Sequence, residues 1–487
     1  MSLQQRHVTA PEDRIPLLQK SAYAVGAVVN NLQAAALPAM MVILNLGLGM
    51  DPVLVGWIAF IPRIFDAVSD PVVGYVSDNS RTRWGRRRPF IFVGALLSGL
   101  IFALMWQLPE GQTETFYFWV FLAANVLFFL AYTLYATPFV AFGYEMTADY
   151  NERTRLHAFA NTVGQVVWLG VPWFYAIMAN PNLFTDTVQG ARTLAILVGI
   201  TVAVLGVVPA MACRERKTAA VADEEAGKSF VDSMSDFTAG IFTTFSCWPF
   251  LKICAATFLV FNGFQLGMSF SLYVMIYYCF GGNDEAAGSL NGWYGMLTAV
   301  STFGVIQLTG YVATKIDKKT TFLIAISISL FGYALKWFGY NPTQPYWLLI
   351  ATPFVAFGTG SLFTIMGSMI SDVCDYDELQ THKRREGVFG AIYWWMVKVG
   401  MALAGLLTGV MLNASGFDVE LGANQSESTL FYLRVFDVGV PLATSALAIA
   451  IMATYPITEA KALETRQLLE QRRGKLELES DDDGSPS

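Results

Sequence analysis

Long apolar segments, each broken by glycine, proline or charged residues, follow one another along almost the whole chain. A helix needs about 20 residues of low polarity to cross a bilayer, and segments of this length recur throughout. The pattern predicts an all-α membrane protein with about twelve transmembrane helices. The predicted spans lie at roughly 21–46, 52–76, 89–108, 116–142, 158–179, 191–212, 251–280, 291–314, 321–340, 346–371, 388–412 and 432–455.

The longest polar interruption falls in the middle of the chain, at residues 213–250. It begins with Cys213, Arg214 and Glu215 and separates six predicted spans from six others. The predicted domains are therefore an N-terminal tail (1–20), a first six-helix bundle (21–212), a linker (213–250), a second six-helix bundle (251–455) and an acidic C-terminal tail, predicted to be disordered (456–487).

Basic residues are confined to alternate loops. The loops after odd-numbered spans are acidic and contain no Lys or Arg except Arg192 and Arg434, which lie at helix edges. Because loops rich in Lys and Arg stay in the cytoplasm, both termini and the linker are predicted to be cytoplasmic, in a multi-pass protein of the plasma (inner) membrane. The loops after even-numbered spans hold Arg81, Arg83, Arg86, Arg87, Arg88, Arg153, Arg155, Arg214, Arg216, Lys217, Lys228, Lys315, Lys318, Lys319, Lys383, Arg384 and Arg385.

Short repeats relate the two halves. Residues 74–76 and 310–312 both read Gly-Tyr-Val, at the ends of the second and eighth spans, and Asp-Tyr recurs at 149–150 and 375–376, after the fourth and tenth. Two pseudo-symmetric bundles can rock against each other and expose a site between them to either side in turn. The architecture therefore favours a transporter over a receptor or a membrane enzyme.

Composition narrows the function further. The chain is 54% hydrophobic and 14% charged, against roughly 25% charged residues in soluble domains. Its net charge of -7, without a long basic stretch, argues against a nucleic-acid partner.

The five cysteines are scattered, and no HExxH motif or nucleophile–base pair is present, so neither a structural metal, a cofactor nor an enzyme activity is expected. The predicted partners are the lipid bilayer, a monovalent cation and a small-molecule substrate, and the chain is predicted to act as a monomer.

Five ionisable residues of the predicted spans are singled out as lying at membrane depth: Arg63, Asp66, Asp70, Lys336 and Lys398. Charges at membrane depth are costly and therefore indicate function. The first three are spaced three and four residues apart, so they project from one helical face. Lys398 is central in its span and is expected to meet a carboxylate or a substrate oxygen, whereas Lys336 is expected to snorkel to the nearby membrane surface.

The two aspartates form a candidate cation site, because hard cations take oxygen ligands. Either sodium or a proton suits the pair. Ser69, and Thr133 from the fourth span, could add neutral oxygens. The alternative is that Arg63 only neutralises one aspartate in a buried ion pair, although one arginine cannot neutralise two carboxylates.

Two motifs resemble those of the glycoside-pentoside-hexuronide:cation symporters of the major facilitator superfamily, to which melibiose permeases belong. The first is RIFDAVSDPVVG at 63–74, followed by Ser77, Asp78 and TRWGRRRP at 82–89. The second is SDVCDYDE at 371–378 with KRREG at 383–387, and Lys398 beyond. The resemblance covers all twelve predicted spans in order. It implies cation-coupled symport of a sugar or glycoside by alternating access.

The family's functional residues can be carried over where the motifs match. By resemblance, Asp66, Asp70, Ser69 and Thr133 bind the cation, and Arg63 and Lys398 couple the cation and sugar sites. The resemblance also implies that a network on the cytoplasmic side locks one conformation, and its members here are Asp78, Arg83, Arg86 and Arg87.

Departures from melibiose permeases concern the sugar-reading positions. Asn31 stands where those proteins have an aspartate, and Asn161 where they have an arginine. Polar and aromatic residues of this kind either pack helices together or contact substrate, and the candidates for substrate contact are Asn31, Tyr132, Asn161, Tyr393 and Trp394. The substrate is expected to be another sugar or glycoside, or alternatively a lysolipid or similar amphiphile, since vertebrate relatives of the family carry lysolipids.

Overall fold

The computed structural model describes residues 13–109, 111–147, 149–215, 244, 247–382 and 385–473. These residues form helices and no strand, which confirms the all-α prediction. Most of the predicted linker lies outside them, as do Glu110, Lys383, Arg384 and the chain after residue 473.

Six rods make up the first half of the chain. Glycine and proline interrupt several of them, so one rod can contain more than one helix. The first half consists of α1 (Leu17–Met40) with α2 (Val42–Leu46), α3 (Pro52–Asn79), α4 (Arg88–Met105), α5 (Glu114–Glu145), α6 (Tyr150–Gly164) with α7 (Val166–Gly170), η2 (Val171–Trp173) and α8 (Phe174–Met178), and α9 (Thr187–Gly206) with α10 (Val208–Ala212).

The second half repeats this plan and adds one helix. It consists of α13 (Trp248–Tyr273) continued by the π-helical turn η3 (Val274–Cys279), α14 (Asp284–Ala313), α15 (Lys318–Gly339), η4 (Pro345–Trp347) with α16 (Leu348–Thr381), α17 (Glu386–Ala414), η5 (Val419–Leu421), α18 (Glu427–Ala453) and α19 (Glu459–Arg473).

Eleven helices of the described residues are long and apolar enough to span a membrane. The fifth predicted span is not one of them because it is broken into short pieces, with Pro172 inside the 3-10 turn η2. Proline lacks the N–H that would continue an α-helix. When this broken rod is included, all twelve predicted spans occur in the predicted order along the chain.

The C-terminal tail differs from the prediction. Residues 459–473 form helix α19 instead of a disordered segment, and α19 packs on α16. Leu469 and Thr465 are buried, so a few apolar and hydroxyl contacts at helical spacing suffice to hold a segment that is otherwise strongly charged.

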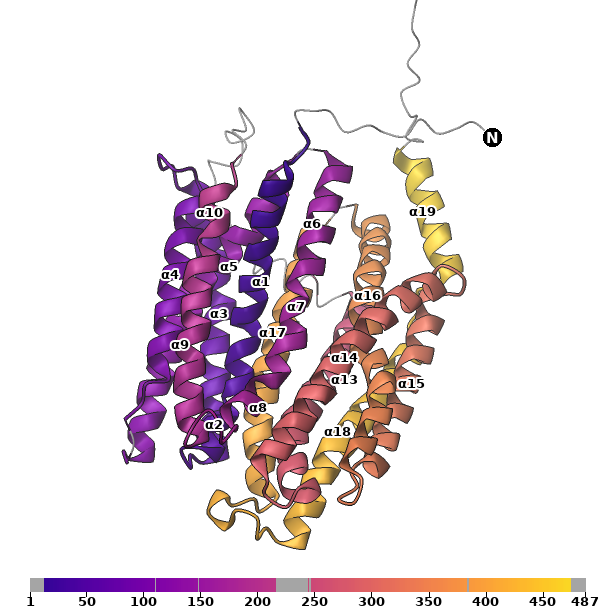
Figure 1. Cartoon of the computed structure of the whole chain (residues 1–487). Coiled ribbons are helices and arrows are strands. Elements are labelled where there is room, and N and C mark those ends of the chain that lie inside the picture. The colour runs from indigo at the N-terminus through magenta and orange to yellow at the C-terminus, as the bar shows by residue number, and fades with distance from the viewer. Residues whose placement is uncertain are drawn as a thin grey trace, which may run out of the picture.

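The halves touch at one end and separate at the other. Figure 1 shows them spreading toward the end at which α1 begins and α19 lies. We call this the basic end, because it also carries Arg86 and Arg87, which precede α4, and Arg88, the first residue of α4. Between the halves, α3 packs on α17, and α14 packs on α7, η2 and α8.

A seal of small residues closes the opposite end. On α14, a Cβ added at Gly292 would lie 2.6 Å from the ring of Trp173, and one at Gly295 would lie 2.3 Å from Pro172. On α17, a Cβ at Gly409 would lie 2.1 Å from the carbonyl oxygen of Pro52. Glycine thus lets backbones of the two halves approach closely. Sequence reasoning missed this seal, because each glycine faces a segment far away in the chain.

The substitution Gly292→Leu is expected to open the seal, because the ring of Trp173 leaves no room for a side chain. Spin labels at the exposed residues Gln112 and Asn424, in loops of the two halves at this end, should report longer distances than in the unsubstituted protein. Gly304→Leu on the same helix is the matched control, since a Cβ there meets nothing within 4 Å. An unchanged distance distribution in Gly292→Leu would contradict the role of the seal.

Candidate cation site

The centre of the molecule holds two carboxylates and one ammonium group in contact. Asp66 and Asp70 lie one turn apart on α3, and Lys398 reaches them from α17 in the other half of the chain. The Lys398 Nζ lies 2.9 Å from Asp66 Oδ2 and also donates to Asp70 Oδ2. Lys398 thus meets carboxylates, as expected from its central position.

Hydroxyl groups of α5 hold the other oxygen of each carboxylate. Thr133 Oγ1 donates to Asp66 Oδ1 at 2.9 Å, and Thr137 Oγ1 donates to Asp70 Oδ1 at 3.1 Å. Ser69 Oγ lies 3.2 Å from Thr133 Oγ1. The structure therefore brings all four residues predicted to bind the cation together. The structure also shows Thr137 at this site, which was not predicted. Its spacing of four residues from Thr133 equals that between the two aspartates, and sequence reasoning could have used this signal.

Exposure differs between the two carboxylates. The side chain of Asp66 is 1% exposed and that of Asp70 is 33% exposed. Asp70 is also the one nearer to the basic end, because α3 runs toward it. The two carboxylates therefore differ in access to solvent: Asp66 is buried, whereas solvent can reach Asp70.

Arg63 does not form the buried ion pair with an aspartate that was considered as the alternative to a cation site. Its guanidinium lies over the ring of Phe129, 4.7 Å from the centroid, and no ion pair joins it to either aspartate in the described part of the chain. Lys398 instead pairs with both aspartates, and its single positive charge can offset only one of them. The three groups in direct contact, two carboxylates and one ammonium, therefore carry a net charge of one negative, which favours a further cation or proton there.

The residues predicted to contact substrate separate into two groups. Asn31 donates to the carbonyl oxygen of Gly164 at 2.9 Å, and the buried Tyr393 lies 3.5 Å from the Thr257 hydroxyl, so both join helices. Asn161 is exposed and Tyr132 is half-buried. Trp394 is 57% exposed and is the most accessible aromatic ring of the set. It lies parallel to Phe363, with 6.0 Å between the ring centroids.

Three of the four predicted gate residues form one cluster at the basic end. Arg87 is 2.6 Å from Asp78 and 2.9 Å from Glu145, and Arg86 also pairs with Glu145. The cluster joins the end of α3, the start of α4 and the end of α5. Arg83 is exposed, and within the described residues no ion pair connects it to the cluster. Glu145 was missed, because it follows an apolar span without any motif.

Glu215 fixes the same loop from the end of the sixth span. Its carboxylate accepts hydrogen bonds from the backbone N–H groups of Arg86, Arg87 and Arg88 at 2.6, 2.6 and 3.1 Å. These N–H groups lie at the start of α4, where a helix favours negative charge. Gly85 has φ 111°, and a Cβ there would lie 2.2 Å from the carboxylate. The carboxylate can approach only because this residue is glycine.

The prediction that Lys336 snorkels to the membrane surface is wrong. Lys336 is 1% exposed and does not snorkel. Its Nζ lies 2.8 Å from Asp437 Oδ1 on α18 and 2.8 Å from Ser271 Oγ on α13. Asp437 was missed among the intramembrane charges, and it is 0% exposed. The prediction failed because it judged Lys336 by its distance from the span end and did not consider a partner on another helix.

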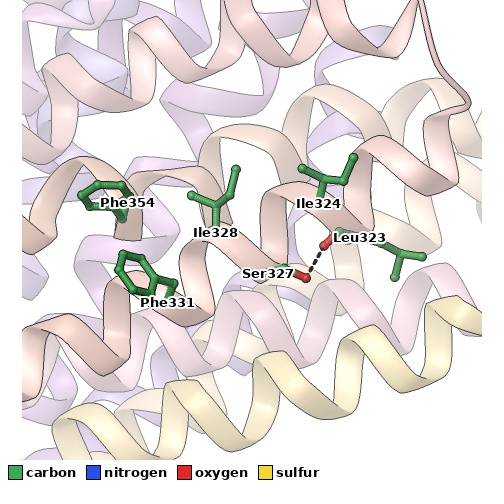
Figure 2. Close-up of a pocket in the computed structure, with 6 residues that line it drawn as sticks. All are labelled: Leu323, Ile324, Ser327, Ile328, Phe331 and Phe354. Atoms are coloured by element: carbon green, nitrogen blue, oxygen red, sulfur yellow. Dashed lines mark hydrogen bonds between the residues drawn. The ribbon is translucent and has the colours of Figure 1, made fainter.

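The surface groove in Figure 2 lies elsewhere, on α15 and α16. Its lining is apolar except for Ser327, whose hydroxyl donates to the backbone oxygen of Leu323. No ionisable side chain lines it. The groove therefore offers no chemistry comparable to that of the aspartates.

Comparisons with known proteins identify the fold and the family. The solved structure of a bacterial homologue of the human lysosomal transporter Spinster has a TM-score of 0.62 at 14% identity, covering 93% of this chain and 97% of that one. The two-bundle helical fold is that of a major facilitator superfamily transporter. The chain belongs to the family described as MFS/sugar transport protein, whose model matches residues 22–459.

Two curated relatives illustrate the range of the family. The glucuronide carrier protein homolog of Escherichia coli is 24% identical, over 93% of this chain and 95% of the relative. The sodium-dependent lysophosphatidylcholine symporter 1 of Gallus gallus is 22% identical, over 97% of this chain and 93% of the relative.

Proposed function

We propose that the protein is a secondary active transporter that couples movement of a cation, sodium or a proton, to symport of a sugar or glycoside by alternating access. One observation carries the proposal: a buried aspartate pair on α3 is bridged by Lys398 from the other half of the chain. In this proposal the protein is a monomer, is not an enzyme, and needs no cofactor besides its coupling ion.

The bridge links cation binding to movement. A cation that binds Asp66 and Asp70 competes with the Lys398 ammonium for the same oxygens, and its binding releases α17 from α3. Since this ion pair is one of the ties between the halves, occupancy of the site changes the energy of rocking them. Arg63, on its aromatic support beside the site, contributes positive charge to the same balance.

The cluster of Asp78, Arg86 and Arg87 at the basic end supports an assignment of this end to one side of the membrane. With basic loops in the cytoplasm, the basic end is cytoplasmic and the glycine seal faces outward. The conformation is then inward-facing. It gives Asp70 access to the cytoplasm and keeps Asp66 dry, as needed for release of the cation into the cell.

A second candidate substrate is a lysolipid. The specific observation in its favour is the apolar character of the exposed ring pair, Trp394 on Phe363, together with Asn31 engaged in helix packing. An aromatic platform stacks on the C–H face of a sugar and also contacts an acyl chain. Asn161 and Tyr132 supply polar contacts in either case.

Uptake into proteoliposomes distinguishes the candidates. We expect at least one labelled glycoside from a panel to accumulate against its gradient when a sodium or proton gradient is imposed, and to stop when an ionophore collapses it. Protein-free liposomes are the control. Accumulation of lysophosphatidylcholine alone would favour the second candidate, and transport of either solute without cation dependence would contradict cation-coupled symport.

A further inference from the structure

Thr137, like Thr133, uses its hydroxyl differently from several other threonines in the spans. A threonine inside a helix commonly returns its hydroxyl hydrogen bond to the carbonyl oxygen four residues earlier, as Thr201, Thr298 and Thr408 do here. The Thr137 hydroxyl donates to the Asp70 carboxylate on α3 instead, at 3.1 Å. Its role is therefore not explained by helix formation.

Thr137 and Asp70 repeat the arrangement of Thr133 and Asp66 one turn further along. Both pairs join α5 to α3, and both leave the second carboxylate oxygen on Lys398. Because α3 and α5 both run toward the basic end, Thr137 and Asp70 form the pair nearer to it. This pair is the half-exposed one, whereas Thr133 and Asp66 are buried.

The local backbone is adapted to this pair on both helices. Asp70 directly precedes Pro71 and Thr137 directly precedes Pro138. Each proline removes one backbone hydrogen bond from its helix. The two helices are thus weakened at the same level, where the ligands of an entering ion must adjust.

We propose that the Thr137 hydroxyl is a further ligand of the coupling ion, paired with Asp70 at the cytoplasmic side of the site. A hydroxyl keeps two lone pairs free while its hydrogen is donated to a carboxylate, and a metal cation needs several oxygen ligands. A sodium ion leaving Asp66 then passes to Asp70 and Thr137 before it reaches the cytoplasm. This inference rests on the proposed cation-coupled function and adds the path and a residue for it.

Sodium binding to purified protein tests the proposal without knowledge of the substrate. Sodium chloride is titrated against choline chloride at constant ionic strength, and tryptophan fluorescence is recorded. Trp394 lies one turn before Lys398 on α17, so displacement of that lysine should change its signal. In Thr137→Val, which replaces the hydroxyl by a methyl group, half-saturation should need at least about 10-fold more sodium.

Two further variants make the result specific. Thr137→Ser keeps the hydroxyl and should retain affinity close to that of the unsubstituted protein. Thr201→Val removes a hydroxyl from α9, where it bonds only to its own helix, and should change nothing. An unchanged sodium dependence in Thr137→Val, or an equal loss in Thr137→Ser, would overturn the proposal.

The unsubstituted protein separates this proposal from the proposed function. If it responds to pH but not to sodium, Thr137 is not a metal-ion ligand, and proton-coupled symport stands. If it responds to neither, and transport is independent of both gradients, the cation-coupled function itself fails.

Discussion

Asp66→Asn is expected to reduce cation-driven accumulation of substrate by at least about 100-fold, because loss of even an outer partner of a metal ligand can cost about 100-fold in affinity or activity. The variant loses the buried negative charge that Lys398 and the cation share. Exchange of labelled for unlabelled substrate involves no net cation movement, so it should persist at a reduced rate. Asp70→Asn is expected to act in the same direction. The measurement is uptake with and without an imposed sodium or proton gradient.

A surface acid controls for charge loss in general. Glu427→Gln neutralises an exposed residue at the start of α18, far from the aspartates in the chain and outside the site, and should leave accumulation unchanged. Amounts of protein in the membrane are compared for all variants. Normal accumulation by Asp66→Asn or Asp70→Asn would refute the cation site.

Asp437→Leu is expected to lower the free energy of unfolding by about 3–5 kcal/mol, because it leaves the ammonium of Lys336 buried without its partner. Lys336 and Asp437 hold α15 and α18 together, and Ser271 brings in α13. The rings of Tyr294 and Tyr340 lie 5.3 and 5.5 Å from the ammonium, which leaves water little access. Unfolding of detergent-purified protein measures the effect.

The double variant Lys336→Met/Asp437→Leu separates an unpaired charge from lost packing. Removing both charges and keeping side-chain volume is often neutral or stabilising in a protein interior. We therefore expect the double variant to recover most of the stability that Asp437→Leu loses. Equal losses in the single and double variants would mean that packing and not charge dominates at this position.

The candidate site was predictable from sequence where its residues lie on one helix. Asp66 and Asp70 share a face because they are four residues apart, and Thr137 was within reach of the same reasoning, applied to α5 from Thr133. Ser69 sits inside the motif itself. Lys398 was expected to meet a carboxylate or a substrate oxygen, but the sequence did not show that it pairs with these two aspartates, because it is 328 residues from Asp70 and Arg63 lay nearer in the chain.

Long-range partners account for the other misses. Lys336 and Asp437 are 101 residues apart, and neither lies in a motif. Glu215 is 129 residues from Arg86. It meets the loop through backbone N–H groups, which every sequence possesses, so no residue type indicates the contact. The helix α19 likewise depends on packing against α16, since its own composition is polar.

By itself, the sequence determined the helical class, the order of the spans and the carboxylate-bearing face of α3. These follow from local periodicity, because the hydrophobic effect acts on each helix within the membrane or against its neighbours. Only the tertiary structure decided which charges pair, that Lys398 bridges the two aspartates of α3, and that glycine contacts close one end. Such features depend on the approach of segments far apart in the chain, where distances of a few ångströms set the energy of charges in a medium without water.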